Sequence, residues 1–350
     1  MFKASFLMML FIMIFSLNAY SQDCPTEPTE EEMQLMLEYK RAGLYDINTK
    51  IRNNSPRHVL VKWHVIGSDY TKHVAIDEET LAYYLEELNH AFAPAGIEFA
   101  ADPVIHYIWN DDWYENGAST YDIRQVSRLH GAMNVYWANT LVPNSLCGQG
   151  SFSFVYDQGI VMNNTCDGQS DVHGIFIHEV GHYFDLLHTH TWECPEALRC
   201  DVEGDFVCDT PPSPRLWFDA CVNASTCDLW KDAHENCTTT AHPACEETQY
   251  DVGINTINYM SYTEIPCLTE FTQGQCVRAI STYENLRREL HNVPIPQCVG
   301  DLTGDGLVDA GDIGILLAEW GEVAGDLNGD SFTDGGDLAF ILSNWGTCSD

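Results

Sequence analysis

The chain has few basic residues. Only 16 of its 350 residues are lysine or arginine, against 52 aspartates and glutamates, and the formal net charge is −36. A surface of this sign repels phosphate backbones and anionic headgroups, which argues against nucleic acid or an anionic membrane surface as a partner. Part of this acid lies in patterned clusters near the C-terminus.

Long apolar runs are also scarce. One run, FLMMLFIMIFSL, follows Lys3, and it is shorter than the roughly 20 residues that a membrane-spanning helix needs. It ends in NAYSQ, where Ala19 and Ser21 suit a small-residue cleavage rule. The pattern predicts a secretory signal peptide over 1–21, and hence a secreted chain with no membrane span. A membrane anchor is the alternative.

No pair of cysteines has the CxxC spacing of a thiolate zinc site. The chain nevertheless contains fourteen cysteines, all after the leader, and seven of them lie between 194 and 245. An even number in an exported chain predicts a disulfide framework, whose connectivity the sequence does not give. Cys24 could serve as a removable metal ligand, but a free Cys24 would leave an odd number behind, which favours a disulfide.

The chain divides into an arm, a large domain and a small C-terminal unit. Segment 22–56 starts rich in Pro, Thr and Glu and then becomes briefly helical, which fits an N-terminal arm or a short pro-segment. Residues 57–297 form the predicted large domain. Its expected strands are 57–67, 97–102, 104–109, 131–141 and 158–164. Its expected helices are one that follows an Asp77 cap and is stopped by Pro94 and Gly96, one opened by Asp171, and 274–291.

The stretch HEVGHYFDLLHTH (178–190) points to a catalytic metal. His178 and His182 are four residues apart, so a helix places both imidazoles on one face, where they can bind a single ion. A catalytic zinc takes three protein ligands and leaves one position open. His188 is the expected third ligand, but a straight helix could not bring it to the same ion. The chain must therefore turn.

Asp185 lies where that turn needs a left-handed residue. Glycine adopts this conformation most easily, and Asn or Asp are the next most tolerant, at a strain of about 1 kcal/mol relative to glycine. Glu179 follows the first histidine and should lie beside the open position of the zinc. There it would take a proton from the activated water as general base and later give it to the leaving amine. His190 lies outside the ligand spacing, either near the site or on the surface.

The stretch HEVGHYFDLLH resembles the metzincin signature HExxHxxGxxH, with Asp185 as the one departure. That resemblance implies a methionine turn at NYMSY (258–262), in which Met260 forms an apolar floor under the histidines. It also implies that Tyr262 steadies the metal or the transition-state oxyanion.

Four blocks are similar, in the same order, to the pappalysin-like metallopeptidases of family M43: LVKWHVIG, HEVGHYFDLLHTH, GDFVCDTPP and NYMSYTEIPCLTEFTQGQ. The resemblance covers about 57–290 and implies an α+β, bilobed catalytic domain. The upper half would hold a twisted mixed sheet, a backing helix and the active-site helix. The Cys-rich lower half would hold the methionine turn and the late helix. Substrate would extend along an edge strand, with 148–164 as the candidate rim, and Asp205 and Thr210 would help bind structural calcium.

Residues 300–321 and 325–346 are an internal repeat, and each copy begins with a calcium-type loop that leads into a short apolar helix. Neither helix can bury its apolar face alone, so the two are expected to pack as a pair. The predicted ligands, counting carbonyls at Leu307 and Phe332, are Asp301, Thr303, Asp305, Leu307, Asp309 and Asp312 in the first copy, and Asp326, Asn328, Asp330, Phe332, Asp334 and Asp337 in the second.

The repeat resembles a dockerin-type module with Asp at the twelfth loop position. The resemblance implies a small all-α pair of F-hands over 298–350, two calcium ions, and a cohesin-like or cell-surface partner. A solvated acidic tail is the alternative.

Together these features predict a secreted, zinc-dependent endopeptidase that acts on protein or peptide substrates, with one catalytic zinc and with calcium in the repeats and in the catalytic domain. A calcium-dependent binding or adhesion protein with a vestigial peptidase domain is the main alternative. A zinc hydrolase of a non-peptide amide is a third. The complete set of three histidines and Glu179 favours the endopeptidase.

Overall fold

A computed structural model describes most of the chain. The described residues are 27–46, 57–142, 146–166, 168–190, 204–211, 222–229, 254–292, 307–321, 332–343 and 345–347, with the isolated positions 200, 213, 216, 300, 302, 303 and 327. The predicted leader, Cys24 and five predicted calcium ligands lie outside them, namely Asp301, Asp305, Asp326, Asn328 and Asp330. Within this part of the chain, no helix is long and apolar enough to cross a membrane.

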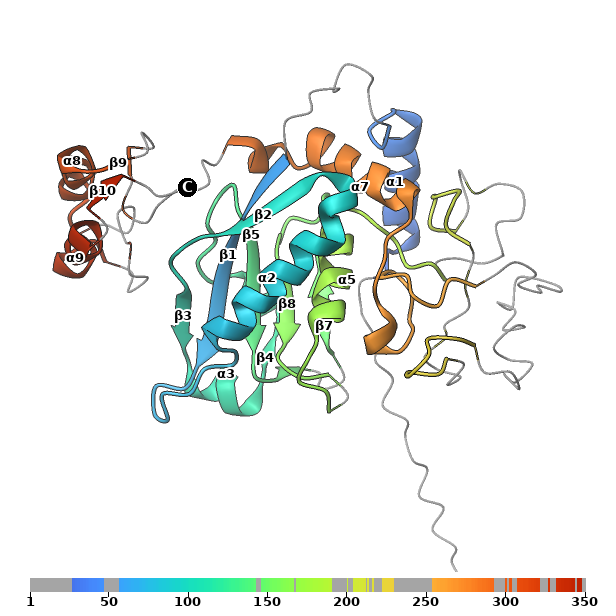
Figure 1. Ribbon diagram of the computed structural model, residues 1–350, viewed down its shortest axis with the longest axis horizontal. Helices are drawn as coiled ribbons and strands as arrows, with labels where there is room; N and C mark the ends of the chain where they lie inside the picture. The colour runs from blue at the N-terminus through green and yellow to red at the C-terminus, as the bar shows by residue number, and fades with distance from the viewer. Residues whose placement is uncertain are drawn as a thin grey trace, which may run out of the picture.

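A six-stranded mixed sheet forms the centre of the catalytic body (Figure 1). Its order is β2-β1-β5-β8-β7, and β3 pairs with the second half of β1; every pairing is parallel except that of β7 with β8. The antiparallel β7 is therefore an edge strand. The strands are β1 (Arg57–Gly67), β2 (Ile97–Ala101), β3 (His106–Trp109), β5 (Met133–Ala138), β7 (Gly148–Gly150) and β8 (Ile160–Asn163).

Five of these strands lie where the sequence predicts them, and β7 is additional. Two helices, α2 (Glu78–Phe92) and α5 (His173–Tyr183), pack over one face of the sheet (Figure 1) and share its main apolar core. Asp77 caps α2 as predicted, since its Oδ1 accepts a hydrogen bond from the Thr80 N–H at 2.8 Å. Asp171 does not open α5: the helix begins at His173, and the buried Val172 occupies the cap position.

The opposite face of the sheet carries smaller elements that the sequence did not predict. These are α3 (Asp111–Asn116), β4 (Ala118–Ser119), α4 (Thr120–Arg124) and β6 (Leu141–Val142). They close a second apolar cluster that includes Ile123, Tyr136 and Val161. Both faces are thus covered, which explains why β5 is buried along its whole length.

The N-terminal arm packs against the catalytic body. Its helix α1 (Glu30–Arg41) begins with a capping box between Thr29 and Glu32. Met33 and Met36 from this helix join an apolar cluster with Tyr45 from the arm and with Phe152, Leu187 and Phe206 from the catalytic body. The arm therefore covers the chain between the second and third histidines.

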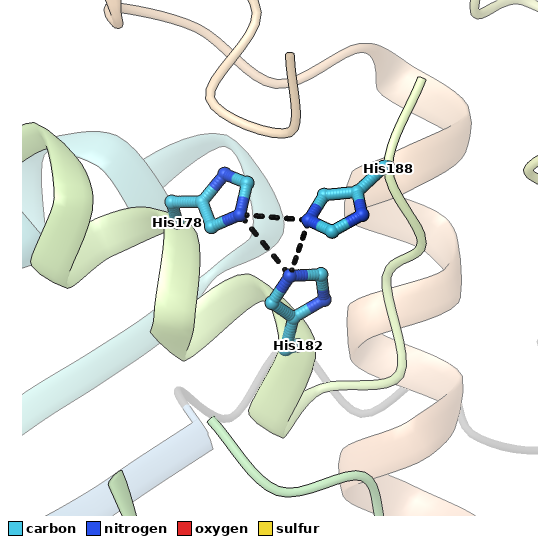
Figure 2. A group of neighbouring side chains, drawn as sticks. All are labelled: His178, His182 and His188. Carbon is cyan, nitrogen blue, oxygen red and sulfur yellow. Dashed lines mark hydrogen bonds between the residues drawn. The ribbon is translucent and has the colours of Figure 1, made fainter. Parts of the chain in front are cut away.

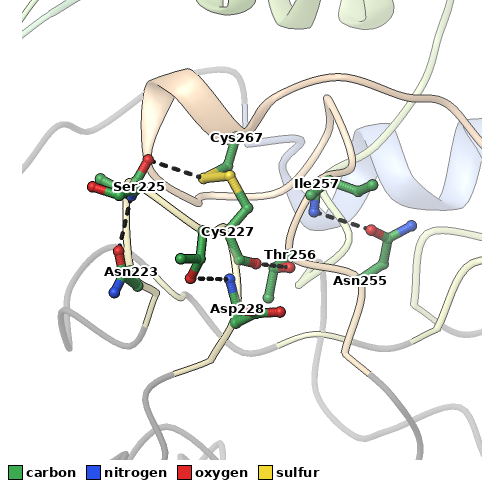
Figure 3. Close-up of a disulfide and its surroundings, with 10 residues drawn as sticks. Asn223, Ser225, Cys227, Asp228, Asn255, Thr256, Ile257 and Cys267 are labelled. Atoms are coloured by element: carbon green, nitrogen blue, oxygen red, sulfur yellow. Dashed lines mark hydrogen bonds between the residues drawn. A yellow bond between two sulfur atoms is a disulfide. The ribbon is translucent and has the colours of Figure 1, made fainter.

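The late helix is shorter than the predicted 274–291. α7 (Gln273–Asn285) ends at Asn285, and a separate 3-10 helix, η4 (Arg288–Asn292), follows it. Asp209 fixes the start of α7 from a distant part of the chain. Its Oδ2 accepts from the Gly274 N–H at 2.8 Å and its Oδ1 from the Thr272 hydroxyl at 2.9 Å. The preceding 3-10 helix η3 (Ile265–Cys267) carries Cys267, which is bonded to Cys227 (Figure 3).

Two further disulfides, Cys147–Cys166 and Cys200–Cys208, lie in the described residues. The predicted framework is therefore partly in place, but Cys276 is a buried free thiol in α7. Complete pairing of all fourteen cysteines is thus wrong. The even number of cysteines therefore no longer argues against a free thiol at Cys24, which lies outside the described residues.

In the C-terminal unit, α8 (Ala310–Ala318) and α9 (Gly335–Ser343) pack together as predicted (Figure 1). Their core contains Val308, Leu316 and Ile341. The unit is not purely helical, which corrects the all-α expectation. β9 (Leu307–Val308) pairs antiparallel with β10 (Gly346–Thr347), because the extended residues on either side of the helices satisfy each other's backbone groups.

Candidate active site

The three predicted ligand histidines converge on one point (Figure 2). The Nε2 atom of His182 lies 3.1 Å from that of His178 and 3.0 Å from that of His188, and the remaining pair is 3.1 Å apart. All three side chains are buried. Helix α5 supplies the first two, and the third comes from the chain just beyond it.

The other ring nitrogens fix the tautomers. His178 Nδ1 donates to the Tyr259 carbonyl at 2.6 Å, and His182 Nδ1 donates to the Leu186 carbonyl at 2.8 Å. Burial, with repulsion from His188, lowers the pKa of both imidazoles, so they are neutral. A neutral ring whose Nδ1 donates outward presents its Nε2 lone pair inward, and two such rings with the Nε2 of His188 beside them match the ligand set of a catalytic zinc.

The turn between the second and third histidines has the conformation predicted from Asp185. Its φ is 60°, in the left-handed region. The Asp185 N–H donates to His182 O at 2.9 Å and the Leu186 N–H to Gly181 O at 3.0 Å, which closes the end of the helix. The chain can then run back toward the metal position and deliver His188.

Glu179 lies on α5, directly against the edge strand. Its Oε2 accepts a hydrogen bond from the Gly150 N–H at 2.6 Å, and its side chain is buried. A Cβ at Gly150 would overlap the backbone carbonyl of Glu179, so only glycine allows β7 to approach the helix this closely. The sequence alone did not predict this contact, although the glycines of the GQG triplet are consistent with such a close approach.

Met260 and Tyr262 both lie near the histidine segment. Met260 is fully buried, and its sulfur packs on Gly181, where a Cβ would overlap it. The Thr189 N–H donates to the Met260 carbonyl at 3.0 Å, which ties the turn to the third-ligand segment. The Tyr262 ring centre lies 4.6 Å from that of His188.

His190 is close to the site and is not a surface residue. Its side chain is 3% exposed, and its ring stacks on His188 with 4.8 Å between centres. Glu27 of the arm reaches both, with Oε1 3.5 Å from His190 Nε2 and 3.7 Å from His188 Nδ1. These three residues form a second group of potential metal ligands, which shares His188 with the first.

Asp205 and Thr210 lie in the described segment 204–211. Asp205 is buried, which raises the pKa of its carboxyl to about 7, and its Oδ1 accepts from the Val207 N–H at 2.9 Å. Thr210 Oγ1 lies 3.2 Å from Thr272 Oγ1, beside the start of α7.

The two C-terminal loops make the same contact where each helix begins, and at the loop start their contacts differ by one position in the repeat. Asp312 accepts from the Thr303 and Asp309 N–H groups at 2.9 and 2.7 Å. In the second loop, Asp337 accepts from the Leu327 and Asp334 N–H groups at 2.6 and 2.7 Å. Leu307 and Phe332 occupy equivalent positions ahead of the helices.

Two buried arginines near the site were not predicted. Arg287 Nε donates to the Tyr183 carbonyl at the end of α5, at 2.6 Å, and its NH2 group donates to Ser151 O at 2.8 Å. Arg124 donates to the Gln149 carbonyl in β7 at 3.0 Å. Basic residues are few in this acidic chain, so each is a weak indication of a specific role. No local sequence pattern, however, identifies the partners of Arg124 and Arg287.

Comparison with known proteins also indicates a metalloprotease. The profile of peptidase family M43, described as pregnancy-associated plasma protein-A, matches residues 99–284. An extracellular metalloprotease of Colletotrichum graminicola is 29% identical over 287 residues, which cover 76% of this chain and 91% of that protein. Extracellular metalloprotease 1 of Coccidioides posadasii is 26% identical over 77% of this chain and 92% of its own length.

Among solved structures, a mutant of Tannerella forsythia promirolysin superposes with a TM-score of 0.52 at 20% identity, over 75% of this chain and 96% of the other. That likeness concerns the fold alone. The family profile, in contrast, spans more than half of the chain and contains all three histidines, the helix that carries two of them and residues 258–262. This chain therefore belongs to peptidase family M43 and is an extracellular zinc metalloprotease.

Proposed function

We propose that the protein is an endopeptidase in which Glu179 is the general base and Tyr262 stabilises the oxyanion. His178, His182 and His188 would hold the zinc. When bound, zinc polarises the scissile carbonyl and makes water more acidic. The observation that carries the proposal is the convergence of three imidazole Nε2 atoms within 3.1 Å of one another, with a buried carboxylate on the same helix.

Each residue has a defined task in this scheme. Glu179 accepts a proton from the attacking water and returns it to the leaving amine, and the Gly150 N–H fixes the position of its carboxylate. Tyr262 would donate a hydrogen bond from its hydroxyl to the developing oxyanion and keep its proton. Edge strand β7 offers backbone groups along which an extended peptide can pair, so cleavage should occur inside chains.

The test compares the native protein with Glu179→Gln on a mixed peptide library, with cut sites read by mass spectrometry and zinc content by elemental analysis. Native protein should cut internal bonds, and the variant should bind zinc but not cut. Equal cleavage by both would remove Glu179 from the mechanism. No cleavage by either, with and without residues 22–56, would favour the calcium-dependent binding protein with a vestigial peptidase domain.

We further propose that residues 22–56 are a removable pro-segment and that the peptidase domain spans 57–297. Glu27 lies within 3.7 Å of His188 and 3.5 Å of His190, and Met36 packs in the cluster beside the third-ligand segment. A covering of this kind restricts access to the metal. Cleaving the arm within 47–56 should raise peptidase activity; unchanged activity after cleavage would make it a permanent arm.

We propose that residues 298–350 form a dockerin-like module that binds two calcium ions and docks on a cohesin-like or cell-surface partner. The N–H contacts that Asp312 and Asp337 make with Asp309 and Asp334, at equivalent positions of the repeat, support equivalent loops. A structural calcium at Asp205 and Thr210 is proposed as well, because a buried carboxylate is stabilised by a cation. Calorimetric titration with calcium chloride should show two sites that are lost when residues 298–350 are deleted, and any remaining site should require Asp205.

A further inference from the structure

A single buried carboxylate connects the third-ligand turn to the loop that follows the edge strand. Asp185 Oδ1 accepts from the Ser153 N–H at 2.7 Å, and Asp185 Oδ2 accepts from the Ser153 hydroxyl at 2.7 Å. Asp185 has no exposed surface. The two contacts occupy both oxygens and engage both the backbone and the side chain of Ser153, so they fix its position in two directions.

The turn itself does not need this carboxylate. A left-handed residue is required at φ 60°, and glycine adopts that conformation at lower cost than aspartate. Aspartate also has to lose its hydration, and this burial raises the pKa of the Asp185 carboxyl. Two unfavourable contributions at one position indicate that the side chain has a use that glycine could not fulfil.

Other contacts hold the same loop, here defined as residues 151–159. Arg287 donates to Ser151 O at 2.8 Å and to Tyr183 O at 2.6 Å, so it joins the loop to the end of α5. Its positive charge also favours the ionised form of Asp185. The Tyr45 hydroxyl from the arm is a third donor to Asp185, at 3.3 Å. The loop is thus attached to the active-site helix through two charged groups of opposite sign.

The position of this loop matters for the reaction. Gly150 lies three residues before Ser153, and its N–H holds the carboxylate of Glu179 at 2.6 Å. Displacement of Ser153 would therefore move the strand end that orients Glu179 and along which substrate is proposed to lie.

We propose that Asp185 is a positioning residue that fixes the loop 151–159, and with it the end of β7, relative to Glu179. The inference rests on the proposed role of β7 as the substrate rim. Asp185 acts through Ser153 and Gly150 and does not touch substrate or metal. Asp185 thereby couples the position of the turn before His188 to the position of the substrate rim.

The test uses Asp185→Gly in the zinc-loaded full chain. Glycine retains or improves the turn, so a residue that served the turn alone would tolerate this change. We expect faster hydrogen exchange of the amides in 151–159 with unchanged exchange in α5 and unchanged zinc content. In the active protein we expect kcat/KM to fall about 10- to 100-fold through misplacement of the rim.

Matched variants separate positioning from general stability. Ser153→Ala removes one of the two contacts and should give part of the effect, and combining it with Asp185→Gly should be less than additive. Asp185→Asn keeps an acceptor for the Ser153 N–H and should rescue part of the loss. Asp77→Ala removes the cap of α2 far from the rim, so it should lower Tm without changing KM or loop exchange.

Unchanged loop exchange in Asp185→Gly, or kcat/KM equal to or above that of the native protein, would overturn the proposal. Hydrogen exchange does not require activity. If native protein cleaves no peptide, the exchange result still decides whether Asp185 fixes the loop, while the endopeptidase proposal fails separately.

Discussion

The zinc centre and the C-terminal loops, which we propose bind calcium, differ in how their ligand groups are held. At the zinc centre, His178, His182 and His188 are 3%, 0% and 0% exposed and are oriented by a core that spans the sheet, α2 and α5. The C-terminal unit buries far less. Its described core has three fully buried hydrophobic residues, and Trp320 and Trp345 remain about half exposed.

The two sites differ in what holds their ligand groups in position. Outward hydrogen bonds to Tyr259 and Leu186 set the ring orientations of His178 and His182 without any metal. In the C-terminal loops, backbone N–H groups hold Asp312 and Asp337, but the clustered carboxylates of each loop repel one another, and a bound cation would offset that repulsion. The protein should therefore lose function when zinc is removed, and lose local structure when calcium is removed.

Removal of zinc should have the largest effect, and it should be on activity. A chelator such as phenanthroline should reduce peptide cleavage by at least about 1000-fold, because the metal supplies several kcal/mol of transition-state stabilisation. Circular dichroism should still show a cooperative unfolding transition, and added zinc should restore activity. An unfolded apoprotein would contradict the idea that the core forms this site.

Removal of calcium should affect the other end of the chain. With EGTA and saturating zinc, we expect α8 and α9 to lose helical structure while peptide cleavage continues unchanged. Asp312→Ala should give the same result in the presence of calcium, because this carboxylate closes the first loop. Glu319→Gln, just after α8, is the matched control and should retain the module. Helical circular dichroism that is insensitive to EGTA would eliminate the calcium-dependent unit.

Local patterns account for what the sequence could predict. Strand alternation, the Asp77 cap and the histidine spacing each depend on residues a few positions apart, and all appear in the structure. β7 lies within the candidate rim 148–164, but its own pattern did not predict a strand, because its sequence, Gly-Gln-Gly, has no apolar alternation. Its place is set by the close approach to Glu179, which is a tertiary contact.

The missed contacts in the site are all long-range. Asp185 was assigned to the turn from its backbone tolerance, but its carboxylate binds Ser153, 32 positions earlier. Arg287 and Asp209 reach partners 104 and 65 positions away. Such pairs leave no periodic trace in a single sequence, so the sequence predicted the zinc ligands but not the framework that orients them.

Substitution of one glycine in α5 and one in α8 tests whether the catalytic body is packed more tightly than the C-terminal unit. In Gly181→Ala, the new Cβ would overlap the sulfur of Met260, so we expect a loss of about 1–3 kcal/mol in stability. In Gly314→Ala, within α8, no atom lies within 4 Å of the new Cβ, and helix propensity should add about 0.5–1 kcal/mol. Calorimetry of both variants measures these shifts. Shifts of the same sign would show that the two regions do not differ in packing.

The smallest effect should appear in the dependence of stability on pH. His64 in β1 is buried on the sheet, with Nε2 3.0 Å from Asn134 Oδ1 and Nδ1 2.9 Å from His106 Nδ1. Burial lowers the pKa of His64 to about 3, and the hydrogen bond to Asn134 opposes this only in part. Nearby positive charge from Lys62 and His106 lowers it further.

Because the folded form binds this proton less readily than the unfolded chain, the contribution of His64 to stability is complete above the unfolded pKa of about 6.5. It is lost as the pH falls toward 3, at about 1.4 kcal/mol per pH unit. His64→Gln should flatten this slope in urea unfolding between pH 6.5 and 4, whereas His90→Gln on the exposed side of α2 should leave it unchanged. If the slope survives His64→Gln, acid sensitivity of the catalytic body arises elsewhere, and the buried sheet does not set the lower pH limit of the enzyme.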